Sequence, residues 1–88
     1  MTRAHVRVRG RVQGVFFRVE ACDRARSLGL AGWVRNASDG TVEAVFEGEQ
    51  ERVRSMVDWC HRGPPGASVD GVDVEWEEPQ GESPFTVA

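Results

Sequence analysis

The sequence predicts an α+β fold in which two helices cover one face of an antiparallel sheet. Apolar and polar residues alternate in four segments, two other segments show helical spacing, and their order along the chain is β-α-β-β-α-β. This arrangement is the split βαβ, or ferredoxin-like, two-layer sandwich. A length of 88 residues suits one small domain, so we expect residues 1–88 to fold as one unit.

In the first half of the chain, a strand is followed by a helix and a hairpin. Apolar and polar residues alternate over residues 4–9, which is typical of a strand with one face on a core. Apolar side chains recur at helical spacing over residues 19–28, and Gly29 suits the end of that helix. Residues 30–36 and 41–47 are predicted strands, and the turn between them contains an Asp-Gly pair, which favours a hairpin.

In the second half, a helix is followed by one long strand. Apolar side chains in residues 49–61 follow helical spacing, and the Gly-Pro-Pro-Gly run at residues 63–66 stops the helix. Residues 69–77 alternate again, and residues 83–88 could add a short edge strand. The right-handed crossover rule places the first strand beside the third in the centre of the sheet. The side chains of the fourth strand expected to point inward are Val72, Val74 and Trp76.

Composition and charge favour a protein that attracts small anions. Residues 1–35 contain eight arginines and two acids, a net charge of +6, whereas residues 36–88 contain three arginines and twelve acids, a net charge of −9. A small anion would be drawn to the positive half, but an acidic chain is a poor candidate for non-specific nucleic-acid binding. No apolar run approaches the roughly 20 residues that span a bilayer, and no signal peptide is recognisable, so we expect a cytoplasmic protein.

The cysteines and histidines predict neither a metal site nor a disulfide. Cys22 and Cys60 both fall in expected helices, where we expect them to be reduced and buried. No cluster of His, Cys and Asp has the spacing of a metal site. Neither His5 nor His61 has an evident nucleophile or carboxylate partner, and no cysteine precedes the glycine loop as a cysteine phosphatase requires.

The stretch between the first strand and the first helix has the features of an anion-binding loop. Gly10 and Gly14 bracket the loop, and Arg18 closes it where the helix begins. Backbone N–H groups, a helix N-terminus and a guanidinium can all point at one anion, most simply a phosphate. The loop lacks the Gly-Lys-Ser/Thr of a Walker loop and the third glycine of a Rossmann fingerprint. Taken alone, the glycines could be turn residues and Arg18 a solvated arginine.

Asn36 ends the second predicted strand, which the sheet order brings near the centre of the sheet. Its simplest role is to begin the turn at residues 37–40. An asparagine can also hold a water molecule through its amide, although it cannot act as a base near neutral pH.

Two runs of residues resemble the signatures of the acylphosphatase family. The first is Val8-x-Gly10-x-Val12-Gln13-Gly14-Val15-x-Phe17-Arg18, and the second is Gly32-Trp33-Val34-Arg35-Asn36-x-x-x-Gly40-x-Val42. The resemblance extends over nearly the whole chain, roughly from residue 6 to residue 74. It implies a ferredoxin-like, acylphosphatase-like domain that hydrolyses acyl phosphates to a carboxylate and inorganic phosphate, without a metal or an organic cofactor.

The resemblance also implies roles for particular residues. Arg18 matches the arginine that binds the phosphoryl group together with loop amides, and Asn36 matches the asparagine that positions the attacking water. The implied partners are an acyl phosphate and phosphate, with no nucleic acid or membrane, and the size and charged faces suggest a monomer. The residues expected to bind the substrate are Val12, Gln13, Gly14, Val15, Phe16, Phe17 and Arg18.

Two other classes of protein would fit the predicted fold. RNA-binding domains of this element order stack bases on aromatic side chains of the open sheet face. Here the two central strands would place on that face no aromatic residue and two acids, among His5, Arg7, Arg9, Glu43, Val45 and Glu47. The second alternative is a non-catalytic regulatory domain that binds a small anion, which the fold permits but which the pairing of Arg18 with Asn36 argues against.

Overall fold

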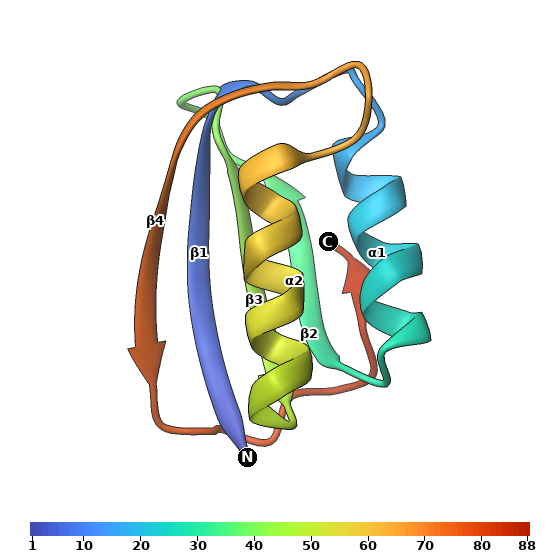
Figure 1. Ribbon diagram of the computed structural model, residues 1–88, viewed down its shortest axis with the longest axis vertical. Helices are drawn as coiled ribbons and strands as arrows, with labels where there is room; N and C mark the ends of the chain where they lie inside the picture. The colour runs from blue at the N-terminus through green and yellow to red at the C-terminus, as the bar shows by residue number, and fades with distance from the viewer.

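The computed structural model describes residues 1–88 and has the predicted order of elements, with one further short strand (Figure 1). Two helices pack on one face of a sheet with the strand order β4-β1-β3-β2-β5, which is the predicted ferredoxin-like arrangement. The elements are β1 (Thr2–Arg11), α1 (Phe17–Ser27), β2 (Ala31–Asn36), β3 (Val42–Gly48), α2 (Gln50–Arg62), β4 (Ser68–Glu77) and β5 (Thr86–Val87).

The sheet is mixed rather than purely antiparallel. The four long strands pair antiparallel as predicted, with β1 between β3 and β4 and with β2 joined to β3 by the hairpin. The short β5, however, lies parallel to β2 at the edge of the sheet. Residues 78–85 run below the sheet from one edge to the other, so the chain returns to β2 in the same direction as that strand (Figure 1).

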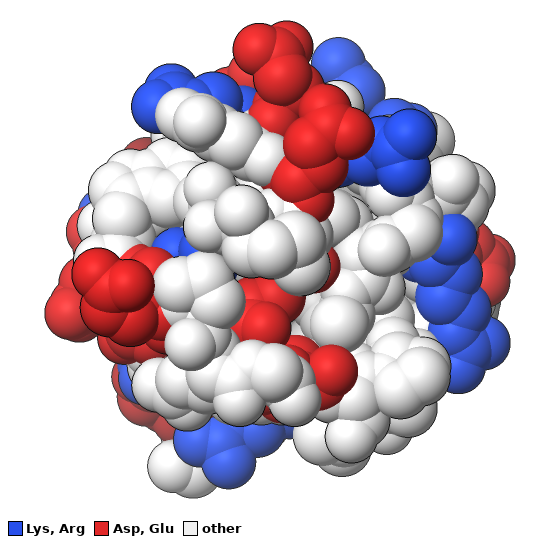
Figure 2. Space-filling view, turned by 90° about the horizontal axis from the view of Figure 1, so that it is seen from below, with Lys and Arg blue, Asp and Glu red and all other residues white.

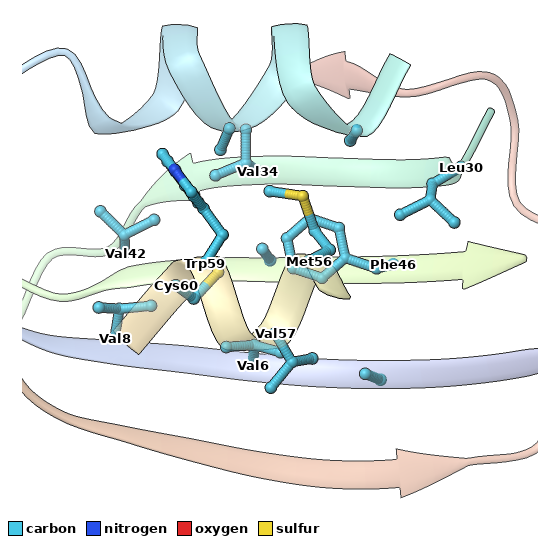
Figure 3. Close-up of a cluster of buried hydrophobic side chains, with 14 of the residues drawn as sticks. Val6, Val8, Leu30, Val34, Val42, Phe46, Met56, Val57, Trp59 and Cys60 are labelled. Atoms are coloured by element: carbon cyan, nitrogen blue, oxygen red, sulfur yellow. The ribbon is translucent and has the colours of Figure 1, made fainter. Parts of the chain in front are cut away.

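A core of apolar side chains fills the space between the sheet and the helices (Figure 3). Alternate residues of β1 and β3 belong to this core, as their period of two predicts, namely Ala4, Val6 and Val8 of β1 and Val42, Ala44 and Phe46 of β3. Helix α2 covers β1, β3 and β4, and helix α1 covers β2 and β5. Neither helix has the length and apolar character needed to cross a membrane. The largest fully buried side chains are Phe17, Phe46, Phe85 and Met56.

Trp76 departs from the prediction that it points into the core. Its side chain remains 50% exposed, because β4 is an edge strand with no neighbour on its outer side. The guanidinium of Arg54 on α2 lies 5.5 Å from the centre of the indole ring, a cation–π contact. The alternation of β4 therefore predicts which side Trp76 faces, but not how deeply it is buried.

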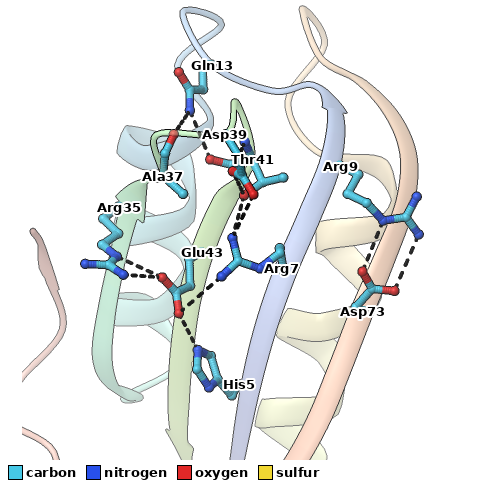
Figure 4. A network of polar contacts seen from close by, with 10 residues as sticks. All are labelled: His5, Arg7, Arg9, Gln13, Arg35, Ala37, Asp39, Thr41, Glu43 and Asp73. Carbon is cyan, nitrogen blue, oxygen red and sulfur yellow. Dashed lines mark hydrogen bonds and ion pairs between the residues drawn. The ribbon is translucent and has the colours of Figure 1, made fainter.

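The sheet face without helices carries ion pairs (Figure 4). The buried carboxylate of Glu43 accepts hydrogen bonds from the guanidinium of Arg35 at 2.6 and 2.8 Å, and it lies 2.6 Å from Nε2 of His5. Burial raises the pKa of Glu43, but its hydrogen bonds with His5 and Arg35 outweigh this effect and hold the pKa below its usual value. Trp33 of β2 also lies on this face, with its ring edge-on to His5 at 6.1 Å.

A second group of ion pairs ties the C-terminal segment to the lower end of the sheet. The guanidinium of Arg3 donates to Glu47 at 2.7 Å, to Glu77 at 2.8 Å and to Glu82 at 2.6 Å. Glu47 also accepts from the backbone N–H groups of residues 80–82. Acidic side chains appear at several places on this end of the molecule (Figure 2), which lies opposite the β1–α1 loop (Figure 1).

Candidate active site

The two predicted halves of the site meet at one end of the molecule. The β1–α1 loop and the turn between β2 and β3 both lie at the upper end in Figure 1. A pocket of about 290 Å³ is lined there by the loop, by the first turn of α1 and by the last residue of β2. The structure thus brings Arg18 and Asn36 to the same pocket from separate elements, as the sequence predicts. The residues that line it are Val12, Gly14, Phe16, Phe17, Arg18, Val19 and Asn36.

The loop presents backbone N–H groups to this pocket. Gly14 and Phe16 both have left-handed backbones, with φ of 73° and 65°, and Val15 lies between them. Such an alternation turns successive N–H groups toward a common point, which is the geometry of an anion-binding nest. The N–H groups of residues 13–19 donate to no acceptor within the protein. Because helix α1 begins at Phe17, the positive end of its dipole adds to the attraction for an anion.

Two buried side chains anchor the loop to the core. Val12 and Phe17 are almost completely buried, and the ring of Phe17 packs against Trp59 at 5.1 Å. Val15 is half-buried and lies near Gly66 in the segment that follows α2. Among the residues expected to bind substrate, Val12 and Phe17 can therefore contribute little beyond their backbone. Their packing fixes the path of the loop that carries the free N–H groups.

Arg18 brings a positive charge to the first turn of α1. Its guanidinium, on a half-buried residue, forms no ion pair or hydrogen bond within the protein, in contrast to Arg7 and Arg35 on the open sheet face. A cation at a helix N-terminus is unfavourable by about 0.3–1 kcal/mol, because the helix dipole is positive there. Glu20 also lies in this first turn, but no acidic side chain pairs with the Arg18 guanidinium. An anion held between the guanidinium and the N–H groups would offset the cost.

Asn36 is the last residue of β2, and its side chain is exposed at the pocket. The hairpin that follows is closed by backbone hydrogen bonds, from Ala37 N–H to the Thr41 carbonyl at 2.8 Å and from Gly40 N–H to the Ala37 carbonyl at 3.2 Å. The side-chain amide of Asn36 has no hydrogen-bond partner within the protein. It is therefore free to bind water or substrate.

Gln13 has a role that the sequence does not reveal. It was expected among the substrate-binding residues, yet its side-chain amide donates to the carbonyls of Ala37 at 2.8 Å and Thr41 at 3.0 Å (Figure 4). Both amide hydrogens are thus used, and only the backbone N–H of Gln13 remains for an anion. The contact joins residues 24 and 28 positions apart, so no local pattern could have predicted it.

The remaining polar and sulfur groups do not extend the site. No group of three or more His, Cys, Asp or Glu side chains in the chain could hold a metal ion. Cys22 and Cys60 are buried, as predicted, and neither forms a disulfide. Burial raises the pKa of the Cys60 thiol to about 12, so that it stays protonated at neutral pH.

Sequence relatives and two solved structures of similar shape carry the description acylphosphatase. The sequence model of the Acylphosphatase family matches residues 4–87. The chain is 60% identical over 82 residues to an acylphosphatase of Roseiflexus sp. (strain RS-1), covering 93% of this chain and 88% of that protein. An acylphosphatase structure from Coxiella burnetii superposes with a TM-score of 0.94 at 42% identity, covering 99% of this chain and 92% of that one. The corresponding structure from Bacillus subtilis gives a TM-score of 0.95 at 35% identity, covering 100% and 99%.

Proposed function

The chain belongs to the acylphosphatase family, whose members hydrolyse acyl phosphates, and we propose that Arg18, Asn36 and the N–H groups of residues 13–19 perform this hydrolysis. The family match does not favour a non-catalytic anion-binding domain. The observation that carries the proposed roles is one pocket that combines free N–H groups, an unpaired guanidinium and a free side-chain amide.

The loop and Arg18 bind the phosphoryl group. Its negative oxygens accept hydrogen bonds from the N–H groups and from the guanidinium, which together neutralise their charge. Phosphoryl transfer is catalysed mostly by positioning and by charge stabilisation, so this set of donors can supply much of the rate enhancement. The carboxylate of an acyl phosphate is a good leaving group and needs no strong general acid.

Asn36 holds the attacking water in line with the bond that breaks. Fixing the water beside the bound phosphoryl group removes the entropy cost of collecting a second reactant. The water oxygen forms a bond to phosphorus while the bond from phosphorus to the acyl oxygen breaks, and the bonding electrons leave with the carboxylate. None of these residues is a base at neutral pH, so an oxygen of the phosphoryl group takes the water proton.

Gln13 holds the phosphate-binding loop and the hairpin that carries Asn36 in a fixed relative position. Its backbone belongs to the phosphate-binding loop, while its side chain holds the carbonyls of Ala37 and Thr41 at the start and end of the β2–β3 turn. Ala37 directly follows Asn36, so these hydrogen bonds set the distance between the water and the phosphoryl group. In this proposal Gln13 is a positioning residue, because its side chain does not touch the reacting atoms.

We extend the proposal to the setting of the enzyme. Residues 1–88 act as one domain and as a cytoplasmic monomer, with an acyl phosphate as substrate, inorganic phosphate as product and no nucleic-acid or membrane partner. The monomeric state is supported by the ion pairs on the open sheet face and by the scarcity of exposed large apolar side chains. Sedimentation equilibrium should give the mass of one chain.

Two substitutions separate the proposed roles. Arg18→Gln should abolish both the hydrolysis of acetyl phosphate and the binding of inorganic phosphate, because it removes the charge that holds the anion. Asn36→Ala should abolish hydrolysis but leave the dissociation constant for phosphate nearly unchanged, measured by phosphate titration of a spectroscopic signal. An Asn36→Ala variant that keeps most of its rate would disprove the water-holding role. Activity should persist in the presence of a metal chelator.

A further inference from the structure

An exposed aromatic side chain lies at the mouth of the active-site pocket. Phe16 is 74% exposed, and its backbone is left-handed, with φ 65° and ψ 18°. This conformation costs a non-glycine residue about 1–2 kcal/mol, and a ring that is mostly exposed recovers little of that cost by burial. Folding alone therefore does not account for a phenylalanine at this position.

A second exposed apolar side chain accompanies Phe16. Val19 lies three residues further along, in the first turn of α1, and is 54% exposed. Both side chains line the active-site pocket. The other apolar lining residues, Val12 and Phe17, are nearly buried and offer little surface. Phe16 and Val19 thus form the accessible apolar wall of the pocket.

The pocket has a polar part and an apolar part, and an acyl phosphate likewise has a charged phosphoryl end and an acyl end. Polar groups of the pocket gather on the loop N–H groups, on Arg18 and on Asn36, and these bind the charged phosphoryl end under the proposed function. The acyl end must then point away from these groups, toward the lining that remains. We propose that Phe16 and Val19 bind the acyl end, and that the enzyme prefers acyl phosphates with apolar, especially aromatic, acyl groups.

The neighbouring cations do not favour a charged acyl group. A shallow pocket on the other side of Asn36 is lined by Arg7 and Arg35. Arg35 already pairs with the carboxylate of Glu43, and Arg7 donates to Thr41 and Asp39. A second carboxylate or phosphate on the substrate would have to compete with these acids. An apolar acyl group bound beside Phe16 would not have to displace any such ion pair.

A series of substrates tests the preference in the unaltered enzyme. The acetate and butyrate released from acetyl and butyryl phosphate are almost equally good leaving groups, so a difference in kcat/KM between these substrates measures contact with the acyl chain. We expect kcat/KM to increase from acetyl to butyryl to benzoyl phosphate. Equal values for acetyl and butyryl phosphate would overturn the proposal. Absence of hydrolysis with all three substrates would instead contradict the proposed function, on which this inference rests.

Substitutions in the wall locate the preference. Phe16→Asn removes the ring but keeps a residue type that tolerates a left-handed backbone. It should lower the ratio of kcat/KM for benzoyl over acetyl phosphate by about two- to tenfold, the range of one aromatic contact. Val19→Ser should lower the same ratio by about twofold. Val87→Ser is the matched control, because Val87 is 44% exposed on the remote strand β5 and should leave the ratio unchanged.

The outcomes discriminate between contact and loop geometry. Both wall variants should keep the inhibition constant for inorganic phosphate within about threefold, because the N–H groups and Arg18 remain in place. Equal losses for benzoyl and acetyl phosphate would mean that the side chains shape the loop rather than bind the acyl group, and would overturn the proposal. If Phe16→Asn does not fold, Val19→Ser and the substrate series still decide the question.

Discussion

The two side-chain hydrogen bonds of Gln13 predict that its substitution lowers the rate of the reaction. In a Gln13→Ala variant, the loop that binds phosphate loses its side-chain connection to the hairpin that carries Asn36. The phosphoryl group should still bind, since the free N–H groups and Arg18 are retained. The attacking water should be less well placed, because Asn36 can then move relative to the loop. We therefore expect a lower kcat and an almost unchanged affinity for phosphate.

The size of the effect follows from the two bonds. They measure 2.8 and 3.0 Å, and each neutral hydrogen bond contributes about 0.5–1.5 kcal/mol net. Together they can hold the hairpin in place by about 1–3 kcal/mol, which corresponds to a 5- to 150-fold effect on an equilibrium. If the displaced hairpin is inactive, kcat should decrease by up to that factor. The inhibition constant for phosphate should change by less than about threefold.

Steady-state hydrolysis of acetyl phosphate, with phosphate as competitive inhibitor, measures both quantities. Arg7→Ala is the matched control, because the Arg7 guanidinium donates to Thr41 Oγ1 of the same hairpin at 2.9 Å, but from the open sheet face. This control should lower stability without a selective loss of kcat. In an Asn36→Ala background, Gln13→Ala should have no further effect on the residual rate, because there is no longer a bound water to misplace.

Three results would refute the reasoning. A Gln13→Ala variant with kcat within twofold of the parent would show that the hairpin needs no such connection. A parallel loss of kcat and phosphate affinity would mean that the side chain supports the loop and not Asn36. An equal loss of kcat in Arg7→Ala would show that any loosening of the hairpin suffices.

Two predictions concern stability. Glu47 accepts four hydrogen bonds. Burial raises the pKa of Glu47, but the hydrogen bonds from backbone N–H groups and Arg3 outweigh this effect and hold the pKa below its usual 4.5. The contribution of Glu47 to the free energy of unfolding is therefore present above about pH 4.5 and is lost as the pH falls below it. Glu47→Gln should lower the free energy of unfolding at pH 7 by about 3 kcal/mol in urea titrations, and this difference should shrink in acid; a constant difference would contradict the assignment. In Gly32→Ala the new Cβ would lie 1.9 Å from the Val45 carbonyl oxygen on the paired strand, so the variant should be unfolded or lose about 4 kcal/mol or more of its free energy of unfolding. Gly40 has a φ of 91° but open space around it, so Gly40→Ala should lose only about 1–2 kcal/mol, measured by thermal denaturation.

The order of the sheet and the faces of its strands could be predicted because they depend on local signals. Alternation fixes which residues of β1 and β3 point inward, and the crossover rule fixes their pairing. The two-residue strand β5 has no period of its own, so its parallel pairing could not be predicted. The burial of Trp76 could not be predicted either, because alternation gives a side and not the position of a strand within the sheet.

Some residues of the site could likewise be predicted from the sequence, and others could not. The loop and Arg18 could be found from glycine spacing and from the start of a helix, and Asn36 from its resemblance to a family pattern. The amide of Gln13 acts across 24 and 28 positions of sequence, where no periodicity applies. Helix α1 begins at Phe17, two residues before the predicted start, and the Phe17 side chain is buried in the core.

Residues 13–19 break two rules of stable structure at once. An arginine lies at the positive end of the dipole of helix α1, and a phenylalanine is exposed in a left-handed conformation. Each departure costs stability, and a sequence selected only for stability would remove both by single substitutions. Their coincidence in one pocket, beside well-packed elements that follow the rules, indicates selection for a bound group that the chain itself does not provide. A phosphoryl group would bind to the free N–H groups and the arginine, and an apolar acyl group would pack against the phenylalanine.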